Sequence, residues 1–376
     1  MSVNIIHVSN LALNGSWFGR LVLTLQERNI SQDLVTLNPS VNNFSPAIPE
    51  GLKISSPRST LRPLKLFQTL VLIRKAKIKG KLNFLFAQGH EEAAICLIAA
   101  KLFGIEFGLV HHVQPQYFPE LMKRKQFKGL IHYSLYKFYI RRSSLIQSLS
   151  SDVTESILRL GVHRNRIVHL GHGVNLEEFS KKISESKPLP QKINNFPVIL
   201  MVGRLSWEKN YKLALESFQK LTSEFTNAKL VIAGIGPMET ELRKLASQLD
   251  LEHKVEFLGY ASNIPRLMLE ADVLLHLSLS ESYGQIYVEA SLVDLPIISF
   301  RVGVIQELID LNNLEITILG SDDPAVIAKT ISLISKNVLP NRKKRPYNPK
   351  QFALHSEKNV LQSMAKYLEK FGQLSK

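Results

Sequence analysis

The stretch Val273-Leu-Leu-His-Leu-Ser-Leu-Ser-Glu281-Ser-Tyr-Gly284-Gln-Ile-Tyr-Val-Glu289 passes from an apolar run through a polar loop into a helical pattern. A short apolar run is typical of a buried strand, and Gly284 allows a close approach of the backbone where the helix begins. The stretch therefore predicts a strand, a loop and a helix, which is the repeating unit of parallel α/β sheets.

The same alternation extends through both halves of the chain. In the second half, the pattern predicts strands at 198–202, 230–233, 255–257, 273–276 and 296–300, and helices at 211–225, 238–249, 264–271 and 284–293. In the first half, it predicts strands at 4–9, 33–37, 83–87, 108–113 and 145–149, and helices around Leu21, at 93–103 and at 152–160. We therefore expect an α/β protein with two doubly wound parallel sheets, each covered on both faces.

Length and composition support two domains. The chain has 376 residues, which is too long for one ordinary core. Residues 179–197 are rich in Lys, Ser, Pro, Gln and Asn without apolar periodicity, so we place a linker there. The expected domains are 1–178 and 198–350. Because ligands of doubly wound sheets bind beyond the carboxyl ends of the strands, we expect the active site in a cleft between the two domains.

Charge and cysteine content narrow the setting. Cys96 is the only cysteine, which favours a reducing compartment such as the cytoplasm, and the sequence predicts neither a signal peptide nor a spanning helix. The net charge of +15 attracts polyanions, such as nucleic acid, anionic lipid or phosphorylated substrates. Two clusters of cations, at 58–81 and 123–142, lie in the first half.

Two loops that follow predicted strands carry side chains suited to a nucleotide. Arg204 and Lys209 lie between a strand and a helix, where their charges can neutralise a pyrophosphate. In the second loop, Glu281 can face a sugar and Glu289 can hydrogen-bond ribose hydroxyls. Ordinary structural roles stay open: solvated surface cations in the first loop, and in the second a helix N-terminal carboxylate for Glu281 and a solvated helix residue for Glu289.

Taken together, these motifs resemble the family 4 glycosyltransferases, which have the two-domain GT-B fold. The resemblance rests on a set of segments in a fixed order: Gly171–Phe179, Gly203–Lys209, Ala233–Pro237, Val255–Gly259, Glu270–Asp272 and Glu281–Glu289. It covers nearly the whole second domain and the end of the first. At 301–306 the chain departs from the family, with Arg301, Val304 and Gln306 where acidic, glycine and proline residues are common.

The resemblance implies a retaining glycosyltransferase that moves a hexose-type sugar from a UDP- or GDP-linked donor to a lipid-linked or polysaccharide glycan, as in polysaccharide or lipopolysaccharide biosynthesis. The first domain would bind the acceptor, the second the nucleotide sugar, and a helix within 351–376 would return to the first domain. No cofactor is implied. We also expect metal independence, since two cations and a helix N-terminus can stabilise the leaving diphosphate and no Asp-x-Asp sequence is present.

The resemblance also assigns residues. Arg204 and Lys209 would bind the diphosphate, Glu289 the ribose, and residues near Leu258 the base. The donor sugar would lie against Glu281, Ser282, Tyr283 and Gly284, followed by Gln285 and Ile286. Gly15 and Ser16 are the nearest match to the family's first-domain glycine loop. His112 would lie near the transferred sugar, with His111 pointing the other way and His90 as a second candidate.

Competing interpretations remain at this point. A nucleotide-sugar epimerase or a phosphorylase shares the fold, whereas a basic nucleic-acid-binding protein would explain the charge but not the paired glutamates. The segment 121–142 interleaves cations with aromatic and apolar residues. It is either an amphipathic element that rests on the inner face of an anionic membrane or a core helix with a basic outer face. We expect a nucleotide sugar and a glycan or lipid-linked acceptor as partners, and no nucleic acid.

Overall fold

The computed structural model describes residues 3–10, 17–37, 52–79, 81–111, 117–185, 197–311, 315–337 and 349–374. Gly15, Ser16 and His112, which the sequence analysis proposed for the site, lie outside these ranges. The chain divides into two units, which are described separately. Unit 1 consists of Met1–His172 with Glu357–Lys376, and unit 2 consists of Gly173–Ser356.

Unit 1 is built on a parallel sheet with the strand order β3-β2-β1-β4-β5-β6-β7. The strands are β1 (Val3–Ser9), β2 (Ser31–Thr36), β3 (Lys53–Ser55), β4 (Leu82–Ala87), β5 (Glu106–His111), β6 (Leu145–Ser148) and β7 (Ile167–His169). The inner strand β1 is buried along its whole length. A parallel strand with helices on both sides is buried on both faces and mostly apolar, so its apolar run is visible in the sequence.

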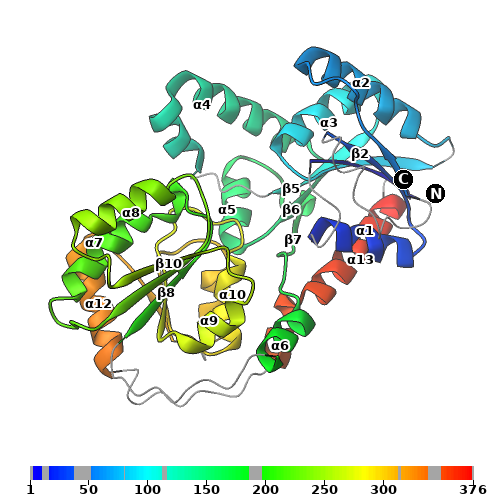
Figure 1. Cartoon of the computed structure of the whole chain (residues 1–376). Helices are drawn as coiled ribbons and strands as arrows, with labels where there is room; N and C mark the ends of the chain where they lie inside the picture. The colour runs from blue at the N-terminus through cyan, green and yellow to red at the C-terminus, as the bar shows by residue number, and fades with distance from the viewer. Residues whose placement is uncertain are drawn as a thin grey trace. The chain divides into compact units, whose positions relative to one another are not determined.

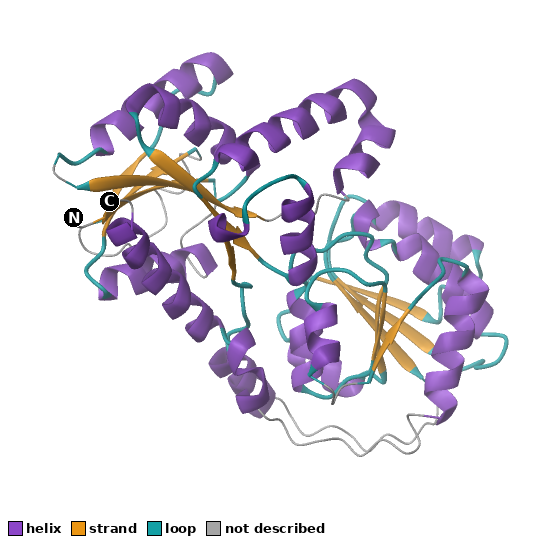
Figure 2. Ribbon diagram, turned by 180° about the vertical axis from the view of Figure 1, so that it is seen from behind, coloured by secondary structure: helices purple, strands orange, loops and turns teal. Residues whose placement is uncertain are grey.

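Helices cover both faces of this sheet (Figures 1 and 2). They are α1 (Trp17–Glu27), α2 (Arg62–Ala76), α3 (His90–Phe103), α4 (Tyr117–Arg142), α5 (Ser151–Arg159) and α13 (Glu357–Leu374). The last helix, α13, packs against α1 near the start of the chain. Arg20 and Glu357 form a two-pronged ion pair at 2.6 and 2.7 Å, and Arg28 pairs with Glu369. These contacts join the C-terminal helix to unit 1.

Unit 2 repeats the design with the strand order β10-β9-β8-β11-β12-β13, again parallel throughout. The strands are β8 (Val198–Val202), β9 (Lys229–Ala233), β10 (Val255–Gly259), β11 (Val273–His276), β12 (Ile297–Ser299) and β13 (Ile316–Ile318). The order reverses between β8 and β11, which are neighbours in the sheet although two strands separate them in sequence. Such a reversal is where doubly wound sheets bind their ligands.

In unit 2, α7, α8 and α12 lie on one side of the sheet, and α9 and α10 on the other (Figure 1). The helices are α6 (Leu176–Ser184), α7 (Tyr211–Leu221), α8 (Glu239–Gln248), α9 (Ile264–Glu270), α10 (Gln285–Leu292), α11 (Ile305–Asp310) and α12 (Pro324–Asn337), with 3-10 turns η3 (Trp207–Lys209) and η5 (Pro349–His355). Leu215 and Phe218 of α7 are fully buried in the core between helices and sheet. The prediction of two parallel α/β domains is confirmed.

Some boundaries differ from the sequence analysis. The division between the units falls at Gly173, and α6 occupies part of the segment that we treated as linker. This helix is short and mostly polar. Asn175 caps it by accepting a hydrogen bond from the backbone N–H of Glu178 at 3.0 Å, and Phe179 is its only buried residue. A single apolar contact leaves no periodicity for sequence reasoning to find.

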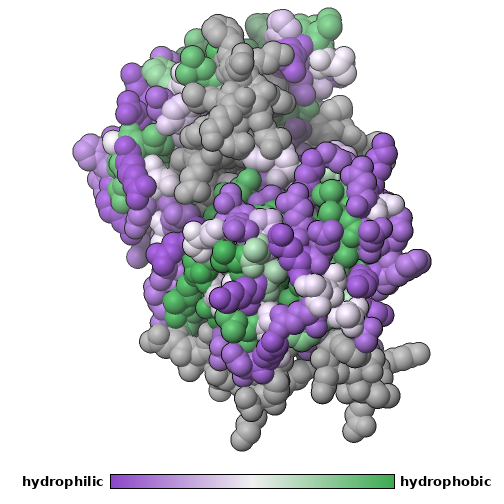
Figure 3. Space-filling model, turned by 90° about the vertical axis from the view of Figure 1, so that its left-hand side faces the viewer, coloured by the Kyte–Doolittle hydropathy of each residue, from purple (hydrophilic) through white to green (hydrophobic). Residues whose placement is uncertain are grey.

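On the face drawn in Figure 3, hydrophilic residues cover most of the described surface, and apolar residues lie in small groups between them. Within the described residues, no helix combines the length and the apolar character that crossing a membrane requires.

Candidate active site

Three loops meet at the carboxyl ends of β8, β9 and β10. The backbone N–H of Gly203 donates to Ala233 at 3.0 Å, that of Gly234 donates to Gly259 at 2.8 Å, and that of Leu205 donates to Ile235 at 3.0 Å. Gly234 has φ +157°, and a Cβ there would lie 1.8 Å from the carbonyl oxygen of Gly203. No larger residue fits at this crossing, which explains the glycine of the 233–237 segment.

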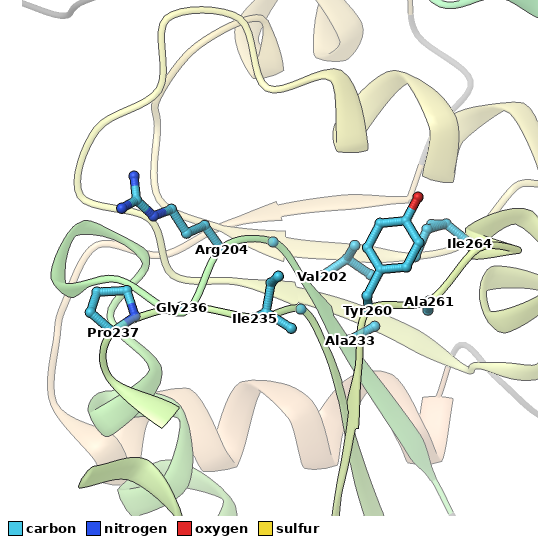
Figure 4. A pocket seen from close by; sticks show the side chains of 11 residues that line it. Val202, Arg204, Ala233, Ile235, Gly236, Pro237, Tyr260, Ala261 and Ile264 are labelled. Carbon is cyan, nitrogen blue, oxygen red and sulfur yellow. The ribbon is translucent and has the colours of Figure 1, made fainter. Parts of the chain in front are cut away.

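A pocket of about 570 Å³ opens above these loops. It is lined by Val202, Gly203, Arg204, Ala233, Gly234, Ile235, Gly236, Pro237, Tyr260, Ala261 and Ile264. Arg204 and Tyr260 lie at opposite sides, with Ile235 between them (Figure 4). The volume is in the range of small-molecule sites, and a mostly apolar wall with few polar side chains is typical of them.

Lys209 lies beside this pocket. A Cβ on Gly203 would contact the side-chain carbons of Lys209 at 3.7 and 3.9 Å, so the lysine stem runs along a residue that lines the pocket. The backbone of Glu208, next to Lys209, accepts from the N–H of Leu279 at 2.8 Å. That bond ties the loop after β8 to the loop after β11, as expected for neighbouring strands. Two segments far apart in sequence thereby meet at one edge of the sheet.

The contact between these loops is a largely buried polar cluster of Lys209, Glu281 and His276. The ammonium of Lys209 donates to Oε1 of Glu281, and Nε2 of His276 lies 2.7 Å from the same oxygen. The side chains are 19%, 12% and 5% exposed, respectively. A charged pair this far from water interacts more strongly than an exposed pair, and it is costly to break on one side only.

The protonation states within the cluster follow from burial and contact. Burial by itself raises the pKa of Glu281, but the hydrogen bond from His276 and the charge of Lys209 outweigh it and hold the pKa at about 2. Burial lowers the pKa of His276, so the imidazole is neutral near pH 7. Because an ionised carboxylate only accepts hydrogen bonds, Nε2 of His276 carries the proton and donates. Glu281 is therefore a fixed anion with two donors on one oxygen.

Gly284 begins helix α10 directly after this cluster. It has φ +80°, and a Cβ there would lie 2.6 Å from the ring of Tyr287, so a residue with a side chain is excluded twice over. Tyr287 is fully buried, its ring lies edge to face with His276 at 4.9 Å between centroids, and its hydroxyl bonds Ser299 at 2.6 Å. The start of α10 is thus held against β11 and β12.

The loop 281–284 is also held from outside. The backbone N–H of Val304 donates to the carbonyl oxygen of Tyr283 at 2.7 Å. The buried Tyr283 side chain places its hydroxyl 3.1 Å from Nδ1 of His355 in η5. Arg301, at the start of the loop that contains Val304, is exposed. The segment that departs from the family pattern therefore packs directly on the predicted sugar-binding loop.

Glu289 lies on α10, two turns after the cluster, and is half-buried. Burial raises the pKa of its carboxyl to about 7, although the charge of Lys182 and a 3.2 Å hydrogen bond from Gln285 act in the opposite direction. A carboxyl group that titrates near neutral pH is a common property of functional sites. The ordinary role considered from sequence for Glu289, a solvated helix residue, does not account for this raised pKa.

Two histidines of unit 1, His90 and His111, are hydrogen-bonded to tyrosines of one helix. Nε2 of His111, at the end of β5, lies 2.7 Å from the hydroxyl of the buried Tyr136, and Nδ1 of His90 bonds the hydroxyl of Tyr139. Both tyrosines belong to α4. His90 and His111 also contact each other edge to face at 5.9 Å between ring centroids. These two histidines link α4 to the ends of β4 and β5.

The structure brings some of the predicted residues together and separates others. Lys209 and Glu281 are in direct contact, whereas Arg204 is exposed at the pocket. Leu258 points outward, and Tyr260 and Ala261, two and three residues later, line the pocket in its place. Of the remaining predicted residues, Ser282 and Ile286 are half-buried and Gln285 is exposed.

Sequence reasoning missed His276 of the polar cluster, and it did not name Tyr260, Ala261 or Ile264, which line the pocket. His276 ends a strand that we predicted, in a sheet whose strand ends were expected to carry the chemistry, and that position was the available signal. Among the described residues, no group of three or more His, Cys, Asp and Glu side chains is arranged to hold a metal ion.

Comparisons with known proteins support the fold. Over 99% of this chain and 98% of the other, the structure aligns with that of HepE from Anabaena in complex with UDP-glucose, with a TM-score of 0.65 and 16% identity. Together with the two parallel α/β units, this likeness defines the fold as GT-B, the two-domain fold of many glycosyltransferases.

The sequence comparison concerns mainly the second half of the chain. The profile described as glycosyl transferases group 1 matches residues 182–351. An uncharacterized glycosyltransferase of Methanocaldococcus jannaschii is 30% identical over 44% of this chain and 45% of its own length. An N-acetylgalactosamine-N,N'-diacetylbacillosaminyl-diphospho-undecaprenol 4-alpha-N-acetylgalactosaminyltransferase of Campylobacter jejuni is 28% identical over 51% of each chain. The chain spans about half the length of these curated relatives.

Proposed function

We propose that this protein is a retaining glycosyltransferase that moves a hexose-type sugar from a nucleotide-diphosphate sugar to a lipid-linked or polysaccharide glycan. The observation that carries the proposal is the contact of Lys209 with both sides of the site. Its stem lies along Gly203 at the pocket, and its ammonium is bound to Glu281 at the sugar loop. A nucleoside in the pocket and a sugar at Glu281 would place the diphosphate between them, beside Lys209.

The chemistry follows from charge. When the bond between sugar and diphosphate breaks, negative charge develops on the leaving phosphate, and fixed cations stabilise that charge. Lys209 is held in place by Glu281, and Arg204 adds a second cation from the same loop. We assign electrostatic catalysis to these two side chains and propose that transfer needs no divalent metal. Equal rates with and without a chelator would support that part of the proposal.

Glu281 suits a binding role better than proton transfer. Because the pKa of Glu281 is held at about 2, its carboxyl group stays ionised near neutral pH and cannot act as a general acid there. An ionised carboxylate accepts hydrogen bonds from sugar hydroxyls. Glu289, whose pKa is raised to about 7, is the carboxyl group that we assign to the ribose.

Unit 1 suggests where the acceptor comes from. Helix α4 buries Tyr136, Tyr139 and Ile140 on one side, while apolar residues on the other side are exposed: Leu130, Ile131, Leu135 and Phe138. Lys101 and Arg142 lie over the ring of Phe138, at 5.3 and 5.0 Å from its centroid. We propose that this outer face of α4 rests on an anionic membrane and collects a lipid-linked acceptor, because cations around exposed aromatic residues suit the lipid interface.

Thermal-shift screening against UDP- and GDP-sugars tests the proposal, because a ligand that binds the folded state raises the melting temperature. UDP-glucose is the first probe, since the structurally similar HepE was solved with it. Arg204→Ala and Glu289→Ala should reduce the shift. The proposal fails if no nucleotide sugar raises the melting temperature, or if both variants bind as the wild type does.

Turnover separates transfer from its rivals. A nucleotide-sugar epimerase would change the donor with no acceptor present, and a phosphorylase would require inorganic phosphate. A transferase consumes the donor at an appreciable rate only when a glycan or lipid-linked acceptor is added. The configuration of the product, read by NMR of the new glycosidic bond, tests retention.

A further inference from the structure

His276 is a buried residue whose hydrogen bond ends on the predicted sugar-binding carboxylate. It is the last residue of β11, and its side chain is 5% exposed. One ring nitrogen, Nε2, lies 2.7 Å from Oε1 of Glu281, while the ring face is packed edge to face with Tyr287 at 4.9 Å. Strand and helix together therefore fix the direction in which this N–H donates.

The two oxygens of Glu281 are used differently. Oε1 accepts from both Nζ of Lys209 and Nε2 of His276, and a carboxylate oxygen has two lone pairs. Within the described part of the chain, no hydrogen bond ends on Oε2. The cluster thus uses both lone pairs of Oε1. Oε2 stays able to accept a hydrogen bond from a ligand, and the Glu281 side chain is still 12% exposed.

We propose that His276 is the positioning residue of the donor-sugar site: its Nε2–H locks Oε1 of Glu281, so that Oε2 is presented at a fixed angle to a hydroxyl group of the donor sugar. This inference rests on the proposed glycosyl transfer and names a residue that acts through Glu281. The imidazole touches neither phosphate nor sugar. Its contribution is to remove one rotational freedom from the carboxylate before the donor binds.

The same bond leaves Lys209 free for the diphosphate. An ammonium group has three N–H donors, and Glu281 takes one of them. If His276 did not share Oε1, the carboxylate could rotate and take a second donor from Lys209. The imidazole therefore keeps the sugar anion and the phosphate cation in contact without letting them neutralise each other completely.

The two phenols that face Glu281 stay uncharged. Tyr211 faces it from α7 and Tyr287 from α10, and burial raises the pKa of both phenols well above neutrality. Lys209 from η3 and His276 from β11 complete the set. Replacing His276 with phenylalanine removes the N–H but keeps a ring against Tyr287, so burial then acts on Glu281 with only Lys209 opposing it. The pKa of Glu281 should rise in that variant.

The test compares His276→Phe with His276→Gln. Glutamine carries an amide N–H at about the same distance from the backbone as Nε2 of histidine, so it should restore the bond. We expect His276→Phe to weaken UDP-glucose binding about 10- to 100-fold, the range for a hydrogen bond to a charged group. UDP, which lacks the sugar, should bind His276→Phe within about threefold of the wild type. His276→Gln should recover most of the loss.

The control is Tyr287→Phe, which removes the 2.6 Å bond to Ser299 from the same interface without touching Glu281. The inference is overturned if His276→Phe weakens UDP and UDP-glucose equally, if it weakens neither, or if Tyr287→Phe reproduces the selective loss. A second measurement needs no donor: ¹³C NMR titration of the Glu281 carboxyl. An unchanged pKa in His276→Phe overturns the inference, whereas absence of nucleotide-sugar binding in the wild type overturns the proposed function instead.

Discussion

Glu289→Gln should abolish the pH dependence of donor binding. The raised pKa of about 7 means that the wild-type carboxyl group changes its charge across the physiological range. If the ionised form accepts hydrogen bonds from the ribose, affinity must follow the ionised fraction. Glutamine has nearly the same shape and does not titrate. The affinity of the variant for the donor should therefore be the same at every pH, and at high pH it should be lower than that of the wild type.

The magnitude follows from the pKa. With a pKa of about 7, roughly one carboxyl in eleven is ionised at about pH 6 and roughly ten in eleven at about pH 8. The apparent affinity for the donor should therefore fall about tenfold, or about 1.4 kcal/mol, when the pH is lowered from about 8 to about 6. Lys182 lowers the pKa of Glu289, so Lys182→Met should move the midpoint to higher pH. Glu281, with a pKa of about 2, does not titrate in this window.

The folding stability of the ligand-free protein should change with pH in the direction opposite to the donor affinity. The folded state binds the Glu289 proton more tightly than the unfolded chain, because burial raises the pKa from 4.5 to about 7. Stability therefore falls as pH rises through this interval, and by about pH 8 the ionised carboxylate costs up to about 3 kcal/mol. Glu289→Gln should remove this cost and raise the melting temperature of the ligand-free protein at about pH 8.

Isothermal titration calorimetry with a nucleotide sugar is the suitable assay, because the diphosphate of the donor is esterified at both ends and keeps its charge across this window. Glu216→Gln, an exposed position on α7, is the matched control and should leave the profile unchanged. A wild-type profile that is flat between about pH 6 and pH 8, or a Glu289→Gln profile with the wild-type slope, would refute the reasoning.

Three further predictions concern other parts of the chain. Arg204→Ala should weaken UDP binding about tenfold, with a smaller dependence on salt than in the wild type, as measured by calorimetry at two ionic strengths. Phe138→Asp should reduce sedimentation with anionic vesicles, whereas Leu333→Asp, at an exposed position of α12, should not; equal effects would contradict the role given to α4. Gly234→Ala should destabilise unit 2 by more than about 3 kcal/mol in urea unfolding, because its Cβ would lie 1.8 Å from a backbone oxygen. An unchanged midpoint would show that the loop can move.

Sequence patterns predicted the inner strands of each sheet better than the short edge strands and the helices with few buried residues. β1, β4, β8 and β11 are mostly apolar because both faces of a parallel sheet are covered, so each stood out as a run. β3 and β13 each have only three residues, none of them fully buried, and leave no such run. α2 buries Thr69 and Ile73 alone, and its basic residues dominated our reading of 58–81 as a charged stretch.

For the site, strand-end logic put Lys209 and Glu281 at the same edge of a sheet, but it did not predict that β8 and β11 are neighbours. It also did not reveal that the two side chains touch, or that His276 shares the same oxygen, because both facts depend on how the 277–281 loop folds back over its own strand. The raised pKa of Glu289 was equally hidden. It depends on burial beside α6, in a segment that the sequence presented as linker.

The docking of α13 on α1 has a consequence for biosynthesis. Unit 1 contains the first and the last parts of the chain, so on the ribosome it lacks Glu357 and Glu369, the partners of Arg20 and Arg28, until all of unit 2 has emerged. Unit 2, continuous from Gly173 to Ser356, has no such delay. Unit 2, although it is synthesised second, can therefore finish folding before unit 1. Until α13 is made, the surface of α1 in the nascent unit 1 stays uncovered, and chaperones have time to bind it.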